Sequence, residues 1–336
     1  MDTSVPNGAP DSAAPPPSNQ NAAGPIHDLV GNVCAGLIGH EGMVERLAIG
    51  LLTGGHLLIE GPPGLAKTRA VKRLASGLEG SFARIQCTPD LMPADVTGTQ
   101  VFRPDTGVFE FVKGPIFHAL VLVDEINRAP PKVQSALLEA MAEGQVTAGG
   151  VTQALPPCFM VVATQNSIEH EGTFPLPEAQ LDRFLMHVML TLPDAVTEMS
   201  ILNLVESEAA QPAVISSLTN SDAILAARKE VETVHLSAAL KDFIVRLVMA
   251  TRDGSPVPEV SEAIEHAVSP RGTLSLAASV RARAYLHGRD YGVPEDVQVL
   301  APDVLAHRII PTWRATANGD TARSLVARLL NDVKPL

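Results

Sequence analysis

The chain of 336 residues has few cysteines, and their spacing excludes two classes of protein. It contains three, Cys34, Cys87 and Cys158, and none forms a Cys-x-x-Cys pair. An odd, widely spaced set predicts neither a disulfide framework nor a cysteine zinc site. We expect three incidental thiols in a reducing compartment.

Basic residues are also scarce. Lys and Arg total 25 against 37 Asp and Glu, which gives a formal net charge of −12. Such a chain is a poor electrostatic match for nucleic acid or anionic lipid, unless a local basic patch exists. No apolar run is long enough to span a membrane, and the Pro-rich start has no apolar signal segment. These absences predict a cytoplasmic protein without membrane insertion.

A glycine-rich stretch after a short apolar run is the first positive signal. Leu57-Leu58-Ile59 precedes Gly61-Pro62-Pro63-Gly64-Leu65-Ala66-Lys67-Thr68, with Arg69 next. A strand, a glycine turn and a helix start bring backbone N–H groups and the helix dipole to phosphate oxygens. Lys67 would reach the β- and γ-phosphates of ATP, and the Thr68 hydroxyl would bind Mg²⁺. The alternative is an ordinary surface turn at a helix start.

A partner acid follows downstream. The apolar run Leu120 to Val123 is typical of a buried parallel strand, and it ends in Asp124-Glu125. There Asp124 would hold Mg²⁺ with its waters, and Glu125 would orient and deprotonate the attacking water. Two solvated acids after a strand are the alternative, but the upstream loop favours the functional interpretation.

Further elements indicate an α/β domain followed by a helical one. We expect strands at 82–86, 158–163 and 184–189, helices at 26–52, after Thr68 and at 131–143, and hairpins at 101–111 and 145–153. Asn166 follows the 158–163 strand, at the end where open sheets bind ligands, although Asn is also common in turns.

After Pro193 helical periodicity dominates, with no strand runs. A loop or short helix is expected at 254–268, and Ser269-Pro270 and Val293-Pro294 each begin a helix. The predicted organisation is a disordered tail (1–25), a nucleotide-binding domain with a doubly wound parallel sheet (26–193) and a helical lid (194–336).

Over residues 26 to 315 the chain resembles the MoxR family of AAA+ ATPases. The specific stretches are the 61–68 loop, Asp124-Glu125-Ile126-Asn127-Arg128-Ala129, 134–141, 171–184, Ser269-Pro270-Arg271 and 305–309. The resemblance accounts for Ala66, because this family has Ala at that loop position. It implies that Asn166 is a sensor-1 residue, Arg183 an arginine finger and Arg271 a sensor-2 residue of the lid. Without the resemblance, a salt bridge from Arg183 to Asp182 or Glu178 is an equal alternative.

The resemblance also implies an activity and partners. It implies Mg²⁺-dependent ATP hydrolysis in a hexameric ring that remodels or matures a partner protein, commonly together with a von Willebrand factor A domain protein. The two hairpins would be the helix-2 insert and the pre-sensor-1 insert. Two rival classes stay open, namely a DNA-acting AAA+ motor and a nucleotide-sensing scaffold with little turnover.

Overall fold

A parallel five-stranded sheet forms the centre of the first half of the chain. The computed structural model describes residues 23–148, 150–167, 172–210, 219–255 and 257–335. The strand order is β10-β1-β9-β6-β3, and all neighbours are parallel. The strands are β1 (Leu57–Glu60), β3 (Phe82–Gln86), β6 (Leu120–Asp124), β9 (Met160–Gln165) and β10 (Met186–Met189). Their carboxyl ends therefore share one edge, where open α/β sheets bind ligands.

Side chains of the central strands alternate between two hydrophobic cores. On β6, Leu120 and Leu122 join one cluster while Val121 and Val123 join the other. Burial on both sides is what helices on both faces of a parallel sheet produce. The first face is covered by α1 (Ala23–Ala35), α2 (Glu41–Thr53) and α3 (Lys67–Gly77), and the second by α4 (Pro93–Thr97) and α5 (Pro131–Glu143). The predicted doubly wound sheet is confirmed.

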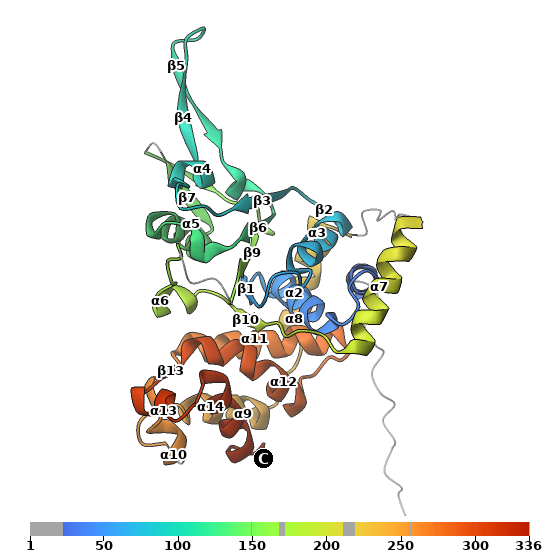
Figure 1. The fold of residues 1–336 in the computed structure, drawn as a ribbon, viewed down its shortest axis with the longest axis vertical. Helices are drawn as coiled ribbons and strands as arrows, with labels where there is room; N and C mark the ends of the chain where they lie inside the picture. Colours follow the sequence, from blue (N-terminus) through green and yellow to red (C-terminus); the bar gives the residue numbers. More distant parts are fainter. Residues whose placement is uncertain (1–22, 149, 168–171, 211–218, 256, 336) are drawn as a thin grey trace, which may run out of the picture.

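Both predicted hairpins are present. They are β4 (Gly98–Arg103) with β5 (Val108–Lys113), and β7 (Gln145–Ala148) with β8 (Val151–Ala154). The β4–β5 hairpin projects well beyond the sheet (Figure 1). Near its tip Phe102 and Phe109 are exposed and their ring centroids lie 5.3 Å apart. Gly149 of the second turn lies outside the described residues.

The C-terminal part is built mainly of helices. They are α7 (Ala195–Ala210), α8 (Ser221–Thr233), α9 (Ala238–Met249), α10 (Pro258–Ser261), α11 (Pro270–Leu286), α12 (Pro294–Leu305), α13 (Trp313–Ala317) and α14 (Ala322–Asp332), while the short α6 (Glu178–Leu181) precedes β10. Helices α8 and α11 pack against α2, so one core continues from the sheet into these helices (Figure 1). Within the described ranges no helix combines the length and apolarity needed to cross a membrane. The predicted domain boundary at 193 stays a prediction.

The structure corrects several predicted boundaries. The predicted helix at 26–52 is two helices, because the chain turns between Gly36 and His40, and Gly39 has a φ of +78° that suits glycine. Helix α1 begins at Ala23, inside the predicted tail, whose residues 1–22 lie outside the described residues. The second half is not free of strands: β11 (Thr219–Asn220) pairs with β2 (Leu78–Glu79), and β12 (Ile264–His266) with β13 (Ile310–Pro311). Strands β9 and β10 each begin two residues later than predicted.

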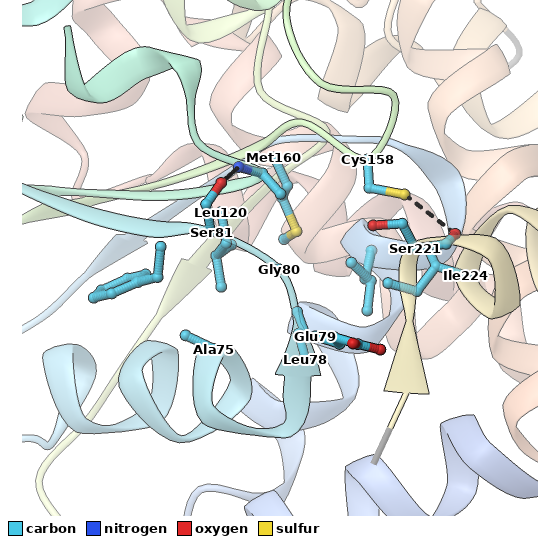
Figure 2. Close-up of a pocket in the computed structure, with 13 residues that line it drawn as sticks. Ala75, Leu78, Glu79, Gly80, Ser81, Leu120, Cys158, Met160, Ser221 and Ile224 are labelled. Atoms are coloured by element: carbon cyan, nitrogen blue, oxygen red, sulfur yellow. Dashed lines mark hydrogen bonds between the residues drawn. The ribbon is translucent and has the colours of Figure 1, made fainter. Parts of the chain in front are cut away.

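A small apolar cavity lies at the amino end of the sheet. It holds about 20 Å³ between the ends of α3 and α8 and the first residues of β3, β6 and β9 (Figure 2). Cys158 points toward α8 there, and its Sγ donates to the carbonyl of Ser221 at 3.6 Å. This volume is about that of one water, so the cavity is a packing defect rather than a ligand site.

His56, directly before β1, is buried as a neutral imidazole. Its Nδ1 accepts from Val161 N–H at 3.0 Å, and its Nε2 donates to the carbonyl of Met141 at 3.1 Å. Burial lowers the pKa of His56 from 6.5 to about 4, and the positive charge of Arg228 adds to this. The ring therefore links β9 and α5 only while it stays uncharged.

We expect this pKa to make the fold acid-sensitive. Between pH 6.5 and 4 the unfolded chain binds a proton at His56 that the folded chain does not, so stability is present above pH 6.5 and is lost as the pH falls toward 4. From pH 7.5 to 5 the loss is about 2 kcal/mol. Urea unfolding of wild type and of His56→Gln at both pH values measures it. The same pH dependence in both proteins would contradict the assignment.

Candidate functional site

The loop between β1 and α3 has the shape of a phosphate cradle. Gly64 has a φ of +86° and Ala66 a φ of +53°, and Ala66 caps α3. A Cβ added at Gly61 would lie 2.9 Å from the carbonyl oxygen of Leu190, so only glycine fits there without a shift. Successive N–H groups and the start of an eleven-residue helix form a site for anions.

Lys67 lies between the ends of two strands. Its Nζ donates to the carbonyl of Gly61 at 2.6 Å and to that of Gln165, at the end of β9, at 3.0 Å. Lys67 is also the first residue of α3. The ammonium group is thus held at the mouth of the loop, above the carboxyl edge of the sheet.

Asp124 is the buried acid at the end of β6. Its side chain is only 6% exposed. Oδ1 accepts from Thr164 Oγ1 at 3.0 Å, and the Thr68 hydroxyl lies 3.2 and 3.3 Å from the two carboxylate oxygens. Oδ2 accepts from Arg84 Nε at 2.6 Å. These contacts join α3, β3, β6 and β9 at one carboxylate.

Glu125 follows in a strained backbone conformation. Its φ of +57° places it in the left-handed region, and its N–H donates to Thr164 Oγ1 at 3.0 Å. Its Oε2 accepts from Gln86 Nε2 at 3.2 Å and from Arg128 Nη1 at 3.1 Å. The turn directs this carboxylate away from the continuing strand, into the cavity described next.

One cavity of about 400 Å³ collects most of the predicted residues. It is lined by Pro63, Gly64, Leu65, Ala66, Lys67, Thr68, Arg69, Arg84, Gln86, Asp124, Glu125, Thr164, Gln165 and Asn166. Gly61 and Pro62, at the beginning of the loop, are outside this lining. Asn166 therefore reaches the same cavity as the loop and the two acids, as predicted from its position after β9.

Arg183 and Arg271 lie outside that lining. Arg183 Nη1 donates to the carbonyl of Leu138 at 2.6 Å. Arg271 Nη1 pairs with Asp182 at 3.0 Å, and the buried Arg308 pairs with the same carboxylate at 2.8 Å. The described ion pairs of Asp182 thus go to the lid, in place of the salt bridge from Arg183 that the sequence left open. Ser269 precedes α11 as predicted, but its hydroxyl donates to Asp182 at 3.4 Å instead of capping the helix.

Sequence analysis missed five polar residues of the site. Arg84, Gln86, Thr164 and Gln165 line the cavity, and Arg128 holds Glu125. A signal existed for the first two, because positions 84 and 86 fall on the same face of a predicted strand. This pattern does not tell which strand lies beside residues 82–86. In the structure that neighbour is β6, and Gln86 is paired with Asp124 in parallel register.

The nearest thiol is not a nucleophile. Cys87 directly follows β3, and its N–H donates to the Asp124 carbonyl at 3.0 Å. Burial raises the pKa of Cys87 to about 12, and the charges of Asp124 and Glu125 contribute. The thiol stays protonated at neutral pH, so it offers no thiolate for catalysis or metal binding.

A second cavity adjoins the phosphate cradle. It holds about 490 Å³ between the α1–α2 turn, the loop and α7, and it shares Pro63 to Ala66 and Arg69 with the first cavity. Its other walls are mainly apolar, including Leu37, Ile38, Leu192, Ile201, Leu202 and Val205. A mostly apolar cavity with a few polar groups is typical of a site for a planar organic group.

The donor set suits Mg²⁺ better than zinc. No group of three or more His, Cys, Asp or Glu side chains that could hold a metal exists within the described residues. A carboxylate and a hydroxyl beside a phosphate cradle are the hard oxygen ligands that Mg²⁺ uses together with phosphates and water. Thr68 and Asp124 therefore fit this ion.

Comparisons with known proteins agree with this geometry. Residues 56–186 match the ATPase family associated with various cellular activities (AAA), and residues 259–329 match an AAA lid domain. A crystal structure of a protein assigned as an ATPase, from Cytophaga hutchinsonii, superposes with a TM-score of 0.85 at 39% identity, covering 94% of this chain and 96% of that one. The chain is thus an AAA+ ATPase by fold, with a helical lid.

Curated relatives identify the branch. Chaperone MoxR1 of Mycobacterium tuberculosis is 40% identical over 325 residues, covering 95% of this chain and 85% of that protein. YeaC of Bacillus subtilis is 40% identical over 313 residues, with 92% and 95% covered. Protein MoxR of Methylorubrum extorquens is 29% identical over 293 residues, with 82% and 85% covered. The chain belongs to the MoxR family of AAA+ ATPases, as the sequence motifs predicted.

The left-handed backbone at Ala66 leads to a prediction. A β-branched side chain is strongly disfavoured at a φ of +53°. We expect Ala66→Val to distort the cradle and weaken binding of a fluorescent ATP analogue by about tenfold or more. Ala66→Gly is the matched control, because glycine adopts this conformation freely and should bind as wild type does. Equal affinity in wild type and the valine variant would contradict the prediction.

Proposed function

We propose that this protein hydrolyses ATP with Mg²⁺ and uses the energy to remodel or mature a partner protein. The observation that carries the proposal is the single cavity where a phosphate cradle, Lys67, two acids and Asn166 meet. Family membership supports nucleotide binding by this cavity. The role of each residue is proposed from the residues that line this cavity.

Each residue of the cavity has a distinct role in this proposal. The loop N–H groups and Lys67 bind the β- and γ-phosphates. Glu125 orients the attacking water and accepts its proton, and Asn166 polarises that water. Phosphoryl transfer depends mainly on positioning and positive charge. In this proposal one subunit supplies every group that the reaction needs except one further cation. Thr68 and Asp124 would hold Mg²⁺, which supplies charge to neutralise the phosphates.

The adjoining cavity is the proposed site for the nucleoside. It continues directly from the loop that binds phosphate, and its walls are mainly apolar. Arg69 lines both cavities, and it is paired with Glu208 on α7. The base would therefore lie between the α1–α2 turn and α7, with the phosphates directed toward β6 and β9.

The missing cation is proposed to come from a neighbouring subunit in a ring, taken as a hexamer. Arg183 is held by the carbonyl of Leu138 and does not line its own subunit's cavity, as an arginine finger that acts in trans requires. Arg271 is proposed as the lid's contact to the γ-phosphate. It must leave Asp182 to make that contact, and its side chain is 54% exposed.

The partner is proposed from the family. One relative is named a chaperone. The resemblance to the MoxR family is the ground for proposing a von Willebrand factor A domain protein as a partner. The β4–β5 hairpin is the proposed contact to the client, because it projects well beyond the sheet (Figure 1) and carries exposed apolar side chains. They include Phe102 and Phe109 on one face of the ribbon and Val101 and Val108 on the other.

The first test separates binding from chemistry. Glu125→Gln keeps shape and hydrogen bonding but removes the base, so we expect ATP binding near that of wild type and hydrolysis slower by ~10²–10⁴-fold. Lys67→Ala is the contrasting variant and should lose binding as well. A phosphate-release assay and a fluorescent ATP analogue measure both steps. Loss of binding in Glu125→Gln would make Glu125 structural, and normal binding in Lys67→Ala would refute the phosphate assignment.

The second test concerns Arg183 and assembly. If Arg183 completes the neighbour's site, hydrolysis per subunit should rise with protein concentration, and Arg183→Ala should abolish that rise while the subunit still binds ATP. Mixing Arg183→Ala with Glu125→Gln should partly restore hydrolysis, because some interfaces then combine an intact Glu125 with an intact Arg183. No rescue in rings shown to have co-assembled would show that Arg183 acts only within its own chain.

A further inference from the structure

Arg84 is a positively charged residue beside the proposed metal ligand Asp124. The proposed function gives Arg84 no role. It lies on β3, and its side chain is 44% exposed toward the cavity. Its Nε donates to Asp124 Oδ2 at 2.6 Å, and its Nη2 donates to Gln86 Oε1 at 2.8 Å. The guanidinium therefore bridges the proposed metal ligand and the side chain next to Glu125.

Arg84 contacts the carboxylate that would hold the metal ion. Thr68 Oγ1 lies 3.3 Å from the same Oδ2 atom that accepts from Arg84. An ion held by Thr68 and by Asp124, directly or through water, would place two positive charges on one small carboxylate. In a partly buried site such charges repel more strongly than in water. A metal ion that uses Oδ2 together with Thr68 would compete with Arg84 for that oxygen.

Burial makes this contact stronger than a surface ion pair. Surface pairs contribute little because water screens them, but the Asp124 side chain is only 6% exposed. A carboxylate this buried needs a counter-charge when no metal is present. Arg84 supplies it from the neighbouring strand.

We propose that Arg84 is an internal counter-ion of Asp124 that competes with Mg²⁺ and must be displaced when the metal enters with the nucleotide. This inference rests on the proposed function. Arg84 is a positioning residue: it sets the metal dependence of the site without touching the reacting atoms.

The displacement also reaches Glu125. Gln86 accepts from Arg84 through Oε1 and donates through Nε2 to Glu125 Oε2 at 3.2 Å. When Arg84 leaves Asp124, the side-chain amide of Gln86 is no longer oriented by Arg84 toward Glu125. Arrival of the metal at Asp124 is thereby coupled to one of the two contacts that hold Glu125, while Arg128 keeps the other.

The test measures metal affinity directly, with Mn²⁺ as a paramagnetic probe. The full-length protein saturated with ADP is titrated with Mn²⁺, and free Mn²⁺ is followed by electron paramagnetic resonance. We expect Arg84→Met, which keeps side-chain length but removes the charge, to bind Mn²⁺ about tenfold more tightly than wild type. Arg84→Gln should shift in the same direction and serves if the first variant does not fold.

Arg128→Met is the matched control. Arg128 is similarly exposed, at 40%, and pairs with Glu125 rather than Asp124. Arg128→Met should change Mn²⁺ affinity by less than about twofold, because the positive charge it removes is paired with Glu125 and not with Asp124. Unchanged or weaker Mn²⁺ binding in the Arg84 variants would overturn the inference, as would an equal gain in both arginine variants. If wild type with ADP binds no Mn²⁺ at all, the proposed function fails as well.

Discussion

The Asp124 carboxylate joins the elements that form the candidate nucleotide site. An ionised carboxylate removed from water costs several kcal/mol unless charges and hydrogen bonds replace the water. Here the replacements come from three other elements: Thr68 of α3, Arg84 of β3 and Thr164 of β9. Each partner has a fixed position along its own element. The strand register and the position of α3 must therefore both be correct for the charge of Asp124 to be satisfied.

The same edge of the sheet stores backbone strain. Among the described residues, the non-glycine positions with positive φ are Ala66 and Glu125, which end the loop after β1 and the strand β6. A left-handed residue with a side chain costs about 1–2 kcal/mol. At Glu125 the N–H bond to Thr164 offsets part of this cost. Strain placed after β1 and after β6, the two strands that flank β9, is typical of a site where orientation matters.

The central strands and the loop of the site were predictable from the sequence, but their contacts and the short outlying strands were not. Leu120 to Val123 could be identified as a doubly covered strand because every side chain in the run is apolar. Lys67, Thr68 and the two acids were predicted from the glycine-rich loop after one strand and from their position after another. The helix at 26–52 was predicted too long because the apolar period continues across Gly36 and Gly39, whose backbone turn depends on packing. Arg84 and Gln86 were missed because their role depends on which strand lies beside β3, a non-local fact that no periodicity encodes.

Asp182, just before β10, shows how the lid is joined to the sheet domain. Arg308, with a side chain only 2% exposed, pairs with Asp182 and also donates to the carbonyls of Phe184 and Leu185. The segment that enters β10 is therefore fixed by buried bonds to Arg308, three residues after the end of α12. Arg271 uses the other oxygen of the same carboxylate, but from an exposed position. Of the two arginines, only Arg271 can exchange Asp182 for another anion without leaving a buried charge unpaired. A nucleotide that attracts Arg271 would thus change one bond at Asp182, next to Arg183, while Arg308 keeps the lid in place.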